Sequence, residues 1–269
     1  SRGLGDVYKR QIMKLKRIAA LLGAFTIASS LFIAGCGNTT TSNNDKVWRV
    51  GTDATYAPFG FKDKDTGKLD GFDIDIINAI AKEEGIEADI QNLNFDALLP
   101  ALQSNTIDIA ISDMTISEDR AKSVDFSNPY YIAGNGLVVN IDNTTIHSFK
   151  DLEGKRIGVS IGSTGAEIAS KIPNADVRQF NIIVDAFLEL ENKGVDVVIN
   201  DTPVNEYYVN NKGRGIAKVT GEDYDAAPLG IAVKKGNTEL LGKINDGLAK
   251  IKANGKYACL LYTSPSPRD

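Results

Sequence analysis

Strand patterns alternate with helical patterns along most of the sequence, and this alternation restricts the fold more than any other feature. In the first half we expect strands at 48–52 and 107–111, a helix at 73–84, and a second helix capped by Asp96. The second half repeats the scheme, with strands at 156–159, 177–180 and 195–199 and helices at 164–172, at 184–191 and from Pro203. Such alternation is typical of a mainly parallel α/β fold. The chain therefore holds two α/β units.

The two units predict two lobes. A last strand at 230–233 and a last helix at 239–254 follow the second unit. With these elements returned to the first unit, the first lobe comprises residues 46–130 and 230–258, and the second comprises residues 131–229. The chain then crosses between the lobes twice, near 130–134 and 225–229. A two-strand hinge of this kind permits the lobes to close without tumbling independently.

The N-terminal segment has the features of a targeting signal. We interpret residues 1–12 as a non-native leader and 13–35 as a signal peptide, because basic residues after Met13 precede the uncharged run 18–33. Ala34 and Gly35 then precede Cys36, as in the lipobox of bacterial lipoproteins, where the cysteine is lipidated. The alternative is an ordinary signal peptide with a chance cysteine. Residues 36–45 are rich in Asn, Thr and Ser and are interpreted as a flexible tether.

The C-terminal residues 259–269 are interpreted as a non-native tail, because the helical pattern ends at Ala258 and two prolines follow. With Cys36 lipidated and Cys259 in the tail, no disulfide is expected. The net charge of −5 argues against binding of nucleic acid. A hydrophobic content of 42% is that of a globular protein rather than a disordered one.

Charged residues stand at strand-to-helix junctions, where α/β proteins bind ligands. Ser117 is expected to cap a short helix with Arg120 in its first turn. The N-terminus of a helix is already partly positive, so a cation there indicates a nearby anion. Asp201 follows the strand 195–199 and precedes Pro203. The alternatives are a solvated arginine and a simple N-cap aspartate. The turn 162–165 has the composition of an anion nest, although one glycine-rich turn is weak evidence.

An ordered set of motifs covers nearly all of residues 46–258. The motifs are 52–59 (TDATYAPF), 71–75 (GFDID), 100–103 (PALQ), 114–120 (MTISEDR), 124–127 (VDFS), 130–131 (YY), 151–155 (DLEGK) and 254–257 (NGKY). In this order they resemble the polar amino-acid-binding proteins of ABC importers, the extracellular solute-binding proteins of family 3. The resemblance implies a periplasmic-binding-protein-like type II fold of two α/β lobes.

The resemblance also implies a role for each of twelve residues. Arg120 and Thr115, with the backbone of Ser163 and Thr164, would hold the α-carboxylate of a free L-amino acid. Asp201 and the carbonyl of Asp113 would take the α-ammonium group, and Tyr56 and Phe95 would enclose the aliphatic stem. The distal group of the ligand would meet Asp53, Ser112 and Asn200, with Ser160 beside it.

Two positions depart from the family pattern and leave the ligand open. Asp113 stands where glycine or serine is commoner, so its carboxylate either points away or makes the pocket more acidic. Ser160 stands where glutamine-binding relatives carry lysine, although the sequence Asp201-Thr202-Pro203 is similar to that same branch. The sequence therefore predicts glutamine or a basic amino acid such as arginine or lysine.

The resemblance implies a binding protein rather than an enzyme, monomeric and without a cofactor or metal. Its expected partners are the ABC permease transmembrane subunits and, through the lipid anchor, the outer surface of the cell membrane. One alternative is a secreted enzyme on the same scaffold, such as a dehydratase. His147 is the only histidine, however, and it lies away from the pocket motifs. Another alternative, a ligand-sensing receptor domain, requires a downstream membrane segment.

Overall fold

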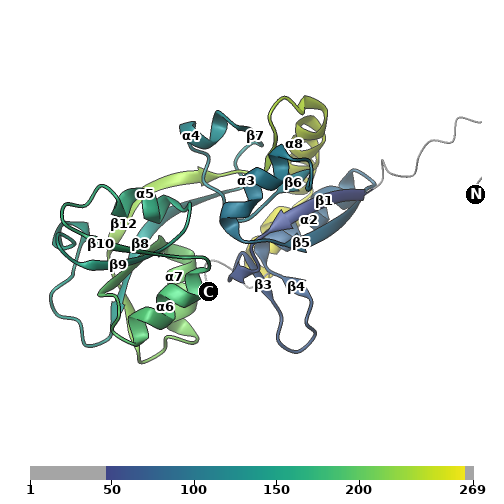
Figure 1. Ribbon diagram of the computed structural model, residues 1–269. Helices are drawn as coiled ribbons and strands as arrows, with labels where there is room; N and C mark the ends of the chain where they lie inside the picture. The colour runs from purple at the N-terminus through teal and green to yellow at the C-terminus, as the bar shows by residue number, and fades with distance from the viewer. Residues whose placement is uncertain (1–46, 264–269) are drawn as a thin grey trace, which may run out of the picture. The chain divides into compact units, whose positions relative to one another are not determined.

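The computed structural model describes residues 47–263, and these residues form two α/β lobes (Figure 1). Each lobe is built on a five-stranded sheet. In both sheets four strands run in one direction, and the fourth strand in spatial order runs against them. The predicted leader, signal peptide, tether and lipidated Cys36 lie outside the described residues.

The first sheet has the order β5-β1-β6-β13-β7. Its strands are β1 (Val47–Thr52), β5 (Glu87–Asn92), β6 (Ile109–Ala110), β7 (Val124–Phe126) and β13 (Ala232–Lys234). Helices α2 (Phe72–Glu83) and α8 (Thr238–Ala253) share one hydrophobic core with the sheet, and α3 (Phe95–Gln103) shares a second. The prediction that Asp96 caps the second helix is wrong. Asn94 is the N-cap residue, and Asp96 lies in the first turn.

The second sheet has the order β10-β9-β11-β8-β12. Its strands are β8 (Tyr131–Asn140), β9 (Arg156–Ser160), β10 (Asp176–Phe180), β11 (Val197–Asp201) and β12 (Ala217–Leu229). Side chains of β11 alternate between two cores. Val198 packs with α6 (Ile183–Glu191) and α7 (Thr202–Asn210), whereas Val197 and Ile199 pack with α5 (Thr164–Ala169). This period of two is that of a strand covered on both faces. A short 3-10 helix, η2 (Phe149–Asp151), precedes β9.

A small three-stranded sheet carries part of the site. It consists of β2 (Thr55–Tyr56), β3 (Gly60–Lys62) and β4 (Leu69–Asp70). Gly71 follows β4 with a φ of 127°, and a Cβ at this position would lie 2.3 Å from the carbonyl oxygen of Phe59. Only glycine fits so close an approach. This contact holds the turn that follows Tyr56 against the start of α2.

Strands β8 and β12 join the lobes. They pair from Tyr131 with Leu229 through to Asn140 with Ala217, with irregular register around Tyr224. β8 follows directly on the first lobe, and β12 leads back into it because β13 pairs with β6 and β7. Figure 1 shows both long strands passing from the second sheet toward the first.

The C-terminal part of the described chain differs from the expectation. Helix α9 (Lys256–Thr263) continues through Cys259, so the helical pattern does not end at Ala258. Leu260 is buried in the same core as Ile76, Ile244 and Leu248. The sequence pattern was too short to reveal this helix, because only Tyr257, Leu260 and Leu261 contact the core.

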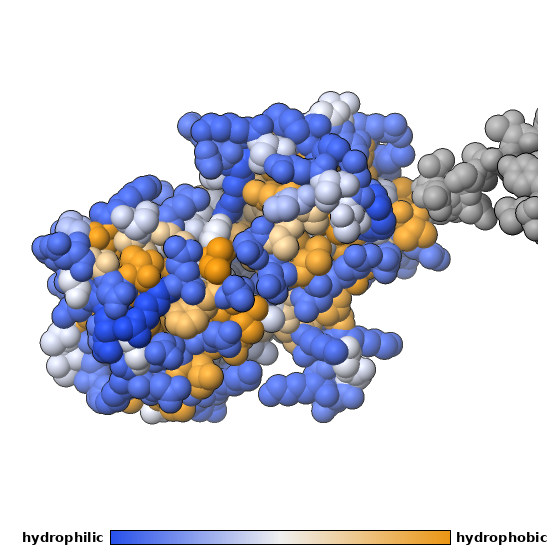
Figure 2. Space-filling view, in the orientation of Figure 1, coloured by the Kyte–Doolittle hydropathy of each residue, from blue (hydrophilic) through white to orange (hydrophobic). Residues whose placement is uncertain are grey.

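Polar residues dominate the visible surface. On the face that Figure 2 shows, hydrophilic residues cover most of both lobes, and hydrophobic residues form small groups between them. Within residues 47–263 no helix has the length and hydrophobicity needed to cross a bilayer.

Candidate functional site

A narrow cavity lies between the lobes. Nine residues line it: Tyr56, Phe95, Asp113, Thr115, Arg120, Ser160, Ser163, Thr164 and Asp201. All nine belong to the twelve that the sequence singled out. They follow the carboxyl ends of strands in both sheets or belong to the short elements beside them. The structure therefore brings together residues from position 56 to position 201.

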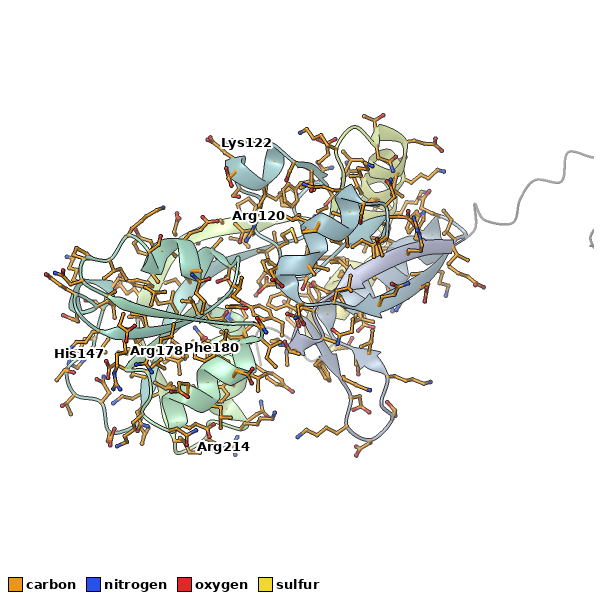
Figure 3. The ribbon with its side chains drawn as sticks, viewed as in Figure 1. Arg120, Lys122, His147, Arg178, Phe180 and Arg214 are labelled. Carbon is orange, nitrogen blue, oxygen red and sulfur yellow. The ribbon has the colours of Figure 1, made fainter. Side chains whose placement is uncertain are left out.

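Arg120 is a buried cation. It lies in α4 (Glu118–Ala121), and its backbone N–H donates to the Oγ of the capping residue Ser117 at 3.3 Å. Its Nη1 donates to the carbonyl of Thr115 at 2.9 Å and its Nη2 to the carbonyl of Gly162 at 3.0 Å. Only 7% of the residue is exposed, so the interpretation as a solvated arginine is wrong. Figure 3 shows Arg120 below α4, on the side that faces the rest of the protein, and Lys122 on the opposite side of the helix.

The Arg120 guanidinium also contacts an aromatic ring. Its Cζ lies 5.2 Å from the centroid of the Phe95 ring, within the range of a cation–π interaction. Burial lowers the pKa of Arg120, while nearby Glu167 and Asp201 oppose that change. Arginine nevertheless keeps its charge at neutral pH. The cavity therefore has a fixed positive charge on the side of the first lobe.

Asp201 supplies a negative charge from the second lobe. It ends β11 and is the N-cap residue of α7, but its side chain makes no capping hydrogen bond, so the simple N-cap interpretation is wrong. Instead its Oδ2 accepts a hydrogen bond of 2.6 Å from the Tyr56 hydroxyl of the first lobe. Burial raises the pKa of the Asp201 carboxyl to about 6, although the Tyr56 hydrogen bond and Arg120 act in the opposite direction.

Hydroxyl groups line the cavity beside Asp201. Ser163 is the N-cap residue of α5, and its Oγ accepts from the N–H of Ala166 at 3.1 Å and donates to the carbonyl of Ser160 at 2.7 Å. Gly162 has a φ of 72°, which turns the chain so that its carbonyl accepts from Arg120. The turn that the sequence suggested as an anion nest thus lies next to the one arginine of the cavity.

Asp113 has an unusual position in the cavity wall. Its φ of 48° is left-handed, which is uncommon for a residue with a side chain but tolerated by aspartate. Glycine would adopt this backbone conformation without strain. Only 3% of the residue is exposed, and neither carboxylate oxygen has a hydrogen-bond partner among the described residues. Burial, followed by the charges of Asp201 and Asp73, raises the pKa of the Asp113 carboxyl well above its ordinary value.

Asp73 supports this wall from behind and was not assigned to the site from the sequence. Its Oδ2 accepts from the N–H of Asp113 at 2.7 Å, and its Oδ1 accepts from the Tyr130 hydroxyl at 2.7 Å. Burial raises its pKa to about 7. A signal was available, because Asp73 precedes Ile76 and Ile77 by three and four residues and so shares the buried face of α2.

Three predicted residues are buried but do not line the cavity: Asp53, Ser112 and Asn200. The Oδ1 of Asp53 accepts from the N–H and the hydroxyl of Thr55, at 2.9 and 2.6 Å. Its own N–H donates to the Oγ of Ser112 at 3.0 Å. The Oδ1 of Asn200 contacts the Tyr56 hydroxyl. These side chains hold the walls of the cavity together.

The described residues contain no cluster of three His, Cys, Asp or Glu placed to hold a metal ion. His147 is exposed and lies in the second lobe, away from Arg120 (Figure 3). The chemistry of the cavity is therefore that of one arginine, two carboxylates, several hydroxyls and two aromatic rings. An anionic and a cationic group on one small molecule complement this set.

Comparison with known proteins agrees with this geometry. Residues 48–262 match the family model of the bacterial extracellular solute-binding proteins, family 3. An ABC transporter arginine-binding protein 1 of Escherichia coli is 37% identical over 249 residues, which cover 91% of this chain and 96% of that protein. A probable histidine-binding protein of Neisseria gonorrhoeae is 35% identical over 257 residues, which cover 91% of this chain and 94% of that protein.

The fold is also similar to that of solved structures. An ancestral arginine-binding protein bound to arginine superposes with a TM-score of 0.79 and 44% identity, over 81% of this chain and 97% of that chain. This similarity confirms the predicted periplasmic-binding-protein-like type II fold of two α/β lobes. From its cavity, its fold and the match over residues 48–262, the chain belongs to the bacterial extracellular solute-binding proteins of family 3.

Proposed function

We propose that this chain captures one free polar L-amino acid between its lobes and delivers it to the permease subunits of an ABC importer. The observation that carries the proposal is the placement of Arg120 and Asp201, which come from different lobes and line one cavity. A zwitterion presents a carboxylate and an ammonium group on the same carbon, so opposite charges on facing walls match it. The relatives named above are an arginine-binding protein and a probable histidine-binding protein, which supports an amino acid as the ligand.

In this proposal each end of the ligand replaces a contact within the protein. The α-carboxylate takes the guanidinium of Arg120 together with Thr115 and the backbone of Ser163 and Thr164. The α-ammonium group donates to Asp201, which now accepts from Tyr56. The rings of Tyr56 and Phe95 pack on the aliphatic stem. The side chain remains glutamine or a basic one such as arginine or lysine.

Capture requires the lobes to separate first. The Tyr56–Asp201 and Arg120–Gly162 hydrogen bonds join the two walls, and little free space remains between them. Strands β8 and β12 supply the hinge in this proposal. Small-angle scattering should give a smaller radius of gyration with ligand than without. Equal radii in both conditions would count against hinge closure.

The decisive experiment is a thermal-shift screen of the twenty amino acids followed by calorimetric titration. A ligand that binds only the folded state stabilises it by RT ln(1 + [L]/Kd). We expect one polar amino acid, or a few, to raise Tm and to bind with one-to-one stoichiometry. A screen in which no amino acid raises Tm would refute the proposed function.

The proposal includes binding without turnover. Carboxylates with raised pKa values, such as Asp73 and Asp201, are also found in enzymes, so this part needs its own test. The protein should return its ligand unchanged after prolonged incubation. Product in excess over protein would establish the secreted-enzyme alternative instead.

We further propose that the mature protein is a monomer anchored outside the cell membrane through lipidated Cys36. Lipid attachment to the first mature residue would tether the lobes beside the permease. Cys36→Ser should release the mature protein into the soluble fraction, with Cys259→Ser as the matched control that stays with the membrane. Membrane retention of both variants would oppose the anchor.

A further inference from the structure

The cavity holds one negative charge more than a zwitterionic ligand can pair. Among its lining residues the charged groups are Arg120, Asp113 and Asp201. If the proposed function is right, the ligand carboxylate pairs with Arg120 and its ammonium group with Asp201. Asp113 then has no counterpart. Burying a carboxylate without a partner is costly, so it either holds a proton or meets a second cation.

The unpaired carboxylate belongs to the cavity wall. Asp113 lines the cavity, and only 3% of its surface is exposed. Neither of its carboxylate oxygens has a hydrogen-bond partner among residues 47–263. Its left-handed φ of 48° carries strain that glycine would avoid. An aspartate kept in this conformation, with no partner inside the described protein, indicates a partner that arrives from outside.

The groups that face Asp113 come from several elements. Asp73 lies in α2, Asp201 at the junction of β11 and α7, and Arg120 in α4. The hydroxyls of Tyr56 and Tyr130 complete the surroundings, and both have their pKa raised by burial and nearby carboxylates. Two carboxylates thus oppose the ionisation of Asp113, and one guanidinium favours it. The Asp113 carboxyl is consequently harder to ionise than an ordinary aspartate, and a further positive charge beside it would favour its ionisation.

We propose that Asp113 is a specificity-determining carboxylate, which selects amino acids with a positively charged side chain and gives up a proton when such a ligand binds. The step balances simply. The cationic side chain takes the place of the proton beside the Asp113 oxygens, and the proton leaves to the solvent. A neutral side chain such as that of glutamine brings no charge and leaves the proton on Asp113. Protons released at Asp201 accompany either ligand, so the difference between ligands belongs to Asp113.

The test compares arginine, lysine and glutamine by calorimetric titration of the wild type and Asp113→Asn. Titrations between pH 6 and 8, in phosphate and in Tris, give the number of protons released from the change in apparent enthalpy. We expect the wild type to release more protons with arginine than with glutamine. Asp113→Asn should abolish this excess and lower the arginine-to-glutamine affinity ratio more than tenfold.

Two further variants make the result specific. Asp113→Gly suits the left-handed backbone, so it provides a folded variant even if Asp113→Asn folds poorly. Asp119→Asn removes an exposed carboxylate from α4, outside the cavity lining. This variant should keep the wild-type affinity ratio and proton release. A loss of selectivity in Asp119→Asn equal to that in Asp113→Asn would overturn the assignment to Asp113.

The outcomes separate this inference from the proposed function. If the wild type binds no amino acid, the proposed function fails. If it binds amino acids with an arginine-to-glutamine ratio that Asp113→Asn and Asp113→Gly leave unchanged, only the role of Asp113 fails. Equal proton release with arginine and glutamine would also overturn that role.

Discussion

In each lobe an arginine near the amino end of one strand binds the aspartate that directly precedes the neighbouring parallel strand, β6 or β11. In the first lobe the N–H and Nε of Arg49 donate to Asp108 Oδ2, both at 3.0 Å, and its Nη2 donates to Oδ1 at 2.5 Å. In the second lobe Arg156 makes the same three bonds to Asp196, at 2.9, 3.1 and 2.5 Å. The amino ends of the strands are thus built alike.

The carboxyl ends of the same strands differ between the lobes. The first lobe contributes Arg120, the rings of Tyr56 and Phe95, and Asp113 to the cavity, whereas the second contributes hydroxyls and Asp201. The two charges assigned to the ends of the ligand, Arg120 and Asp201, therefore come from different lobes. The comparison teaches that one end of each sheet serves stability and the other serves binding, so changes at the two ends should have separable effects.

The largest effect is expected from the cation of the first lobe. Removing one partner of a buried charged contact typically costs about 2 to 5 kcal/mol, which is about 30- to 4,000-fold in affinity. Arg120→Ala should therefore weaken amino-acid binding by this range, as measured by calorimetric titration. Lys122→Ala, on the exposed side of the same short helix, should leave affinity unchanged. Near-native binding by Arg120→Ala would remove the main support for the site.

The second effect concerns stability and pH. Burial raises the pKa of Asp73 from an ordinary 3.8 to about 7, so the folded state binds this proton more tightly than the unfolded state. The contribution is complete below about pH 4 and is lost as pH rises through about 7, at a cost of up to about 4 kcal/mol. Asp73→Asn should remove this loss from the pH profile of unfolding free energy without ligand.

A control sharpens the Asp73 measurement. Asp119 is exposed, and Lys122 holds its pKa below the ordinary value, so Asp119→Asn should change the pH dependence of stability only at lower pH, below about 4. Between pH 5 and 7 its profile should parallel that of the wild type. An Asp73→Asn profile as steep as the wild type would show that other buried carboxyls, such as Asp201, cause the dependence.

A third and smaller effect is expected where the lobes meet. Tyr56→Phe keeps the ring but removes the hydroxyl that donates to Asp201, and that hydrogen bond lowers the pKa of Asp201. The pKa should therefore rise further, so affinity should fall more at pH 6 than at pH 8, by about tenfold or less. Titrations at both pH values test this, with the exposed Tyr224→Phe as control. Equal losses at both pH values would contradict the role of the hydroxyl.

The sequence was informative about which residues meet and less so about how their side chains are used. The junction positions of Arg120 and Asp201 follow from strand order, because parallel strands end at one edge. The side-chain conformation of Asp53 does not follow from strand order. Spacing could not show that its carboxylate turns back to Thr55 rather than toward the cavity. Such local bonds between side chain and backbone depend on atomic geometry.

Two other features depended on tertiary packing. The unpaired state of Asp113 follows from the absence of donors within the described walls around it, which no local pattern records. The continuation of α9 to Thr263 depends on the burial of Leu260 against α2 and α8. In contrast, the two lobes themselves were predictable, because alternating strand and helix patterns hold over long segments.

The smallest effect is expected at the amino ends of the sheets, where the lobes are alike. The side chains of Arg49 and Arg156 are 43% and 39% exposed, so water and salt screen both ion pairs. Arg49→Met and Arg156→Met should each lower Tm by about a few degrees at most, by similar amounts, because each leaves a partly exposed aspartate without its arginine. Neither should alter amino-acid affinity, since both residues lie at the strand ends away from the cavity. Thermal unfolding with and without ligand, at low and high salt, measures both expectations. A drop in affinity with only one of the two variants would show that the amino end of that lobe is coupled to binding, and the division of roles between the two ends of the sheet would not hold.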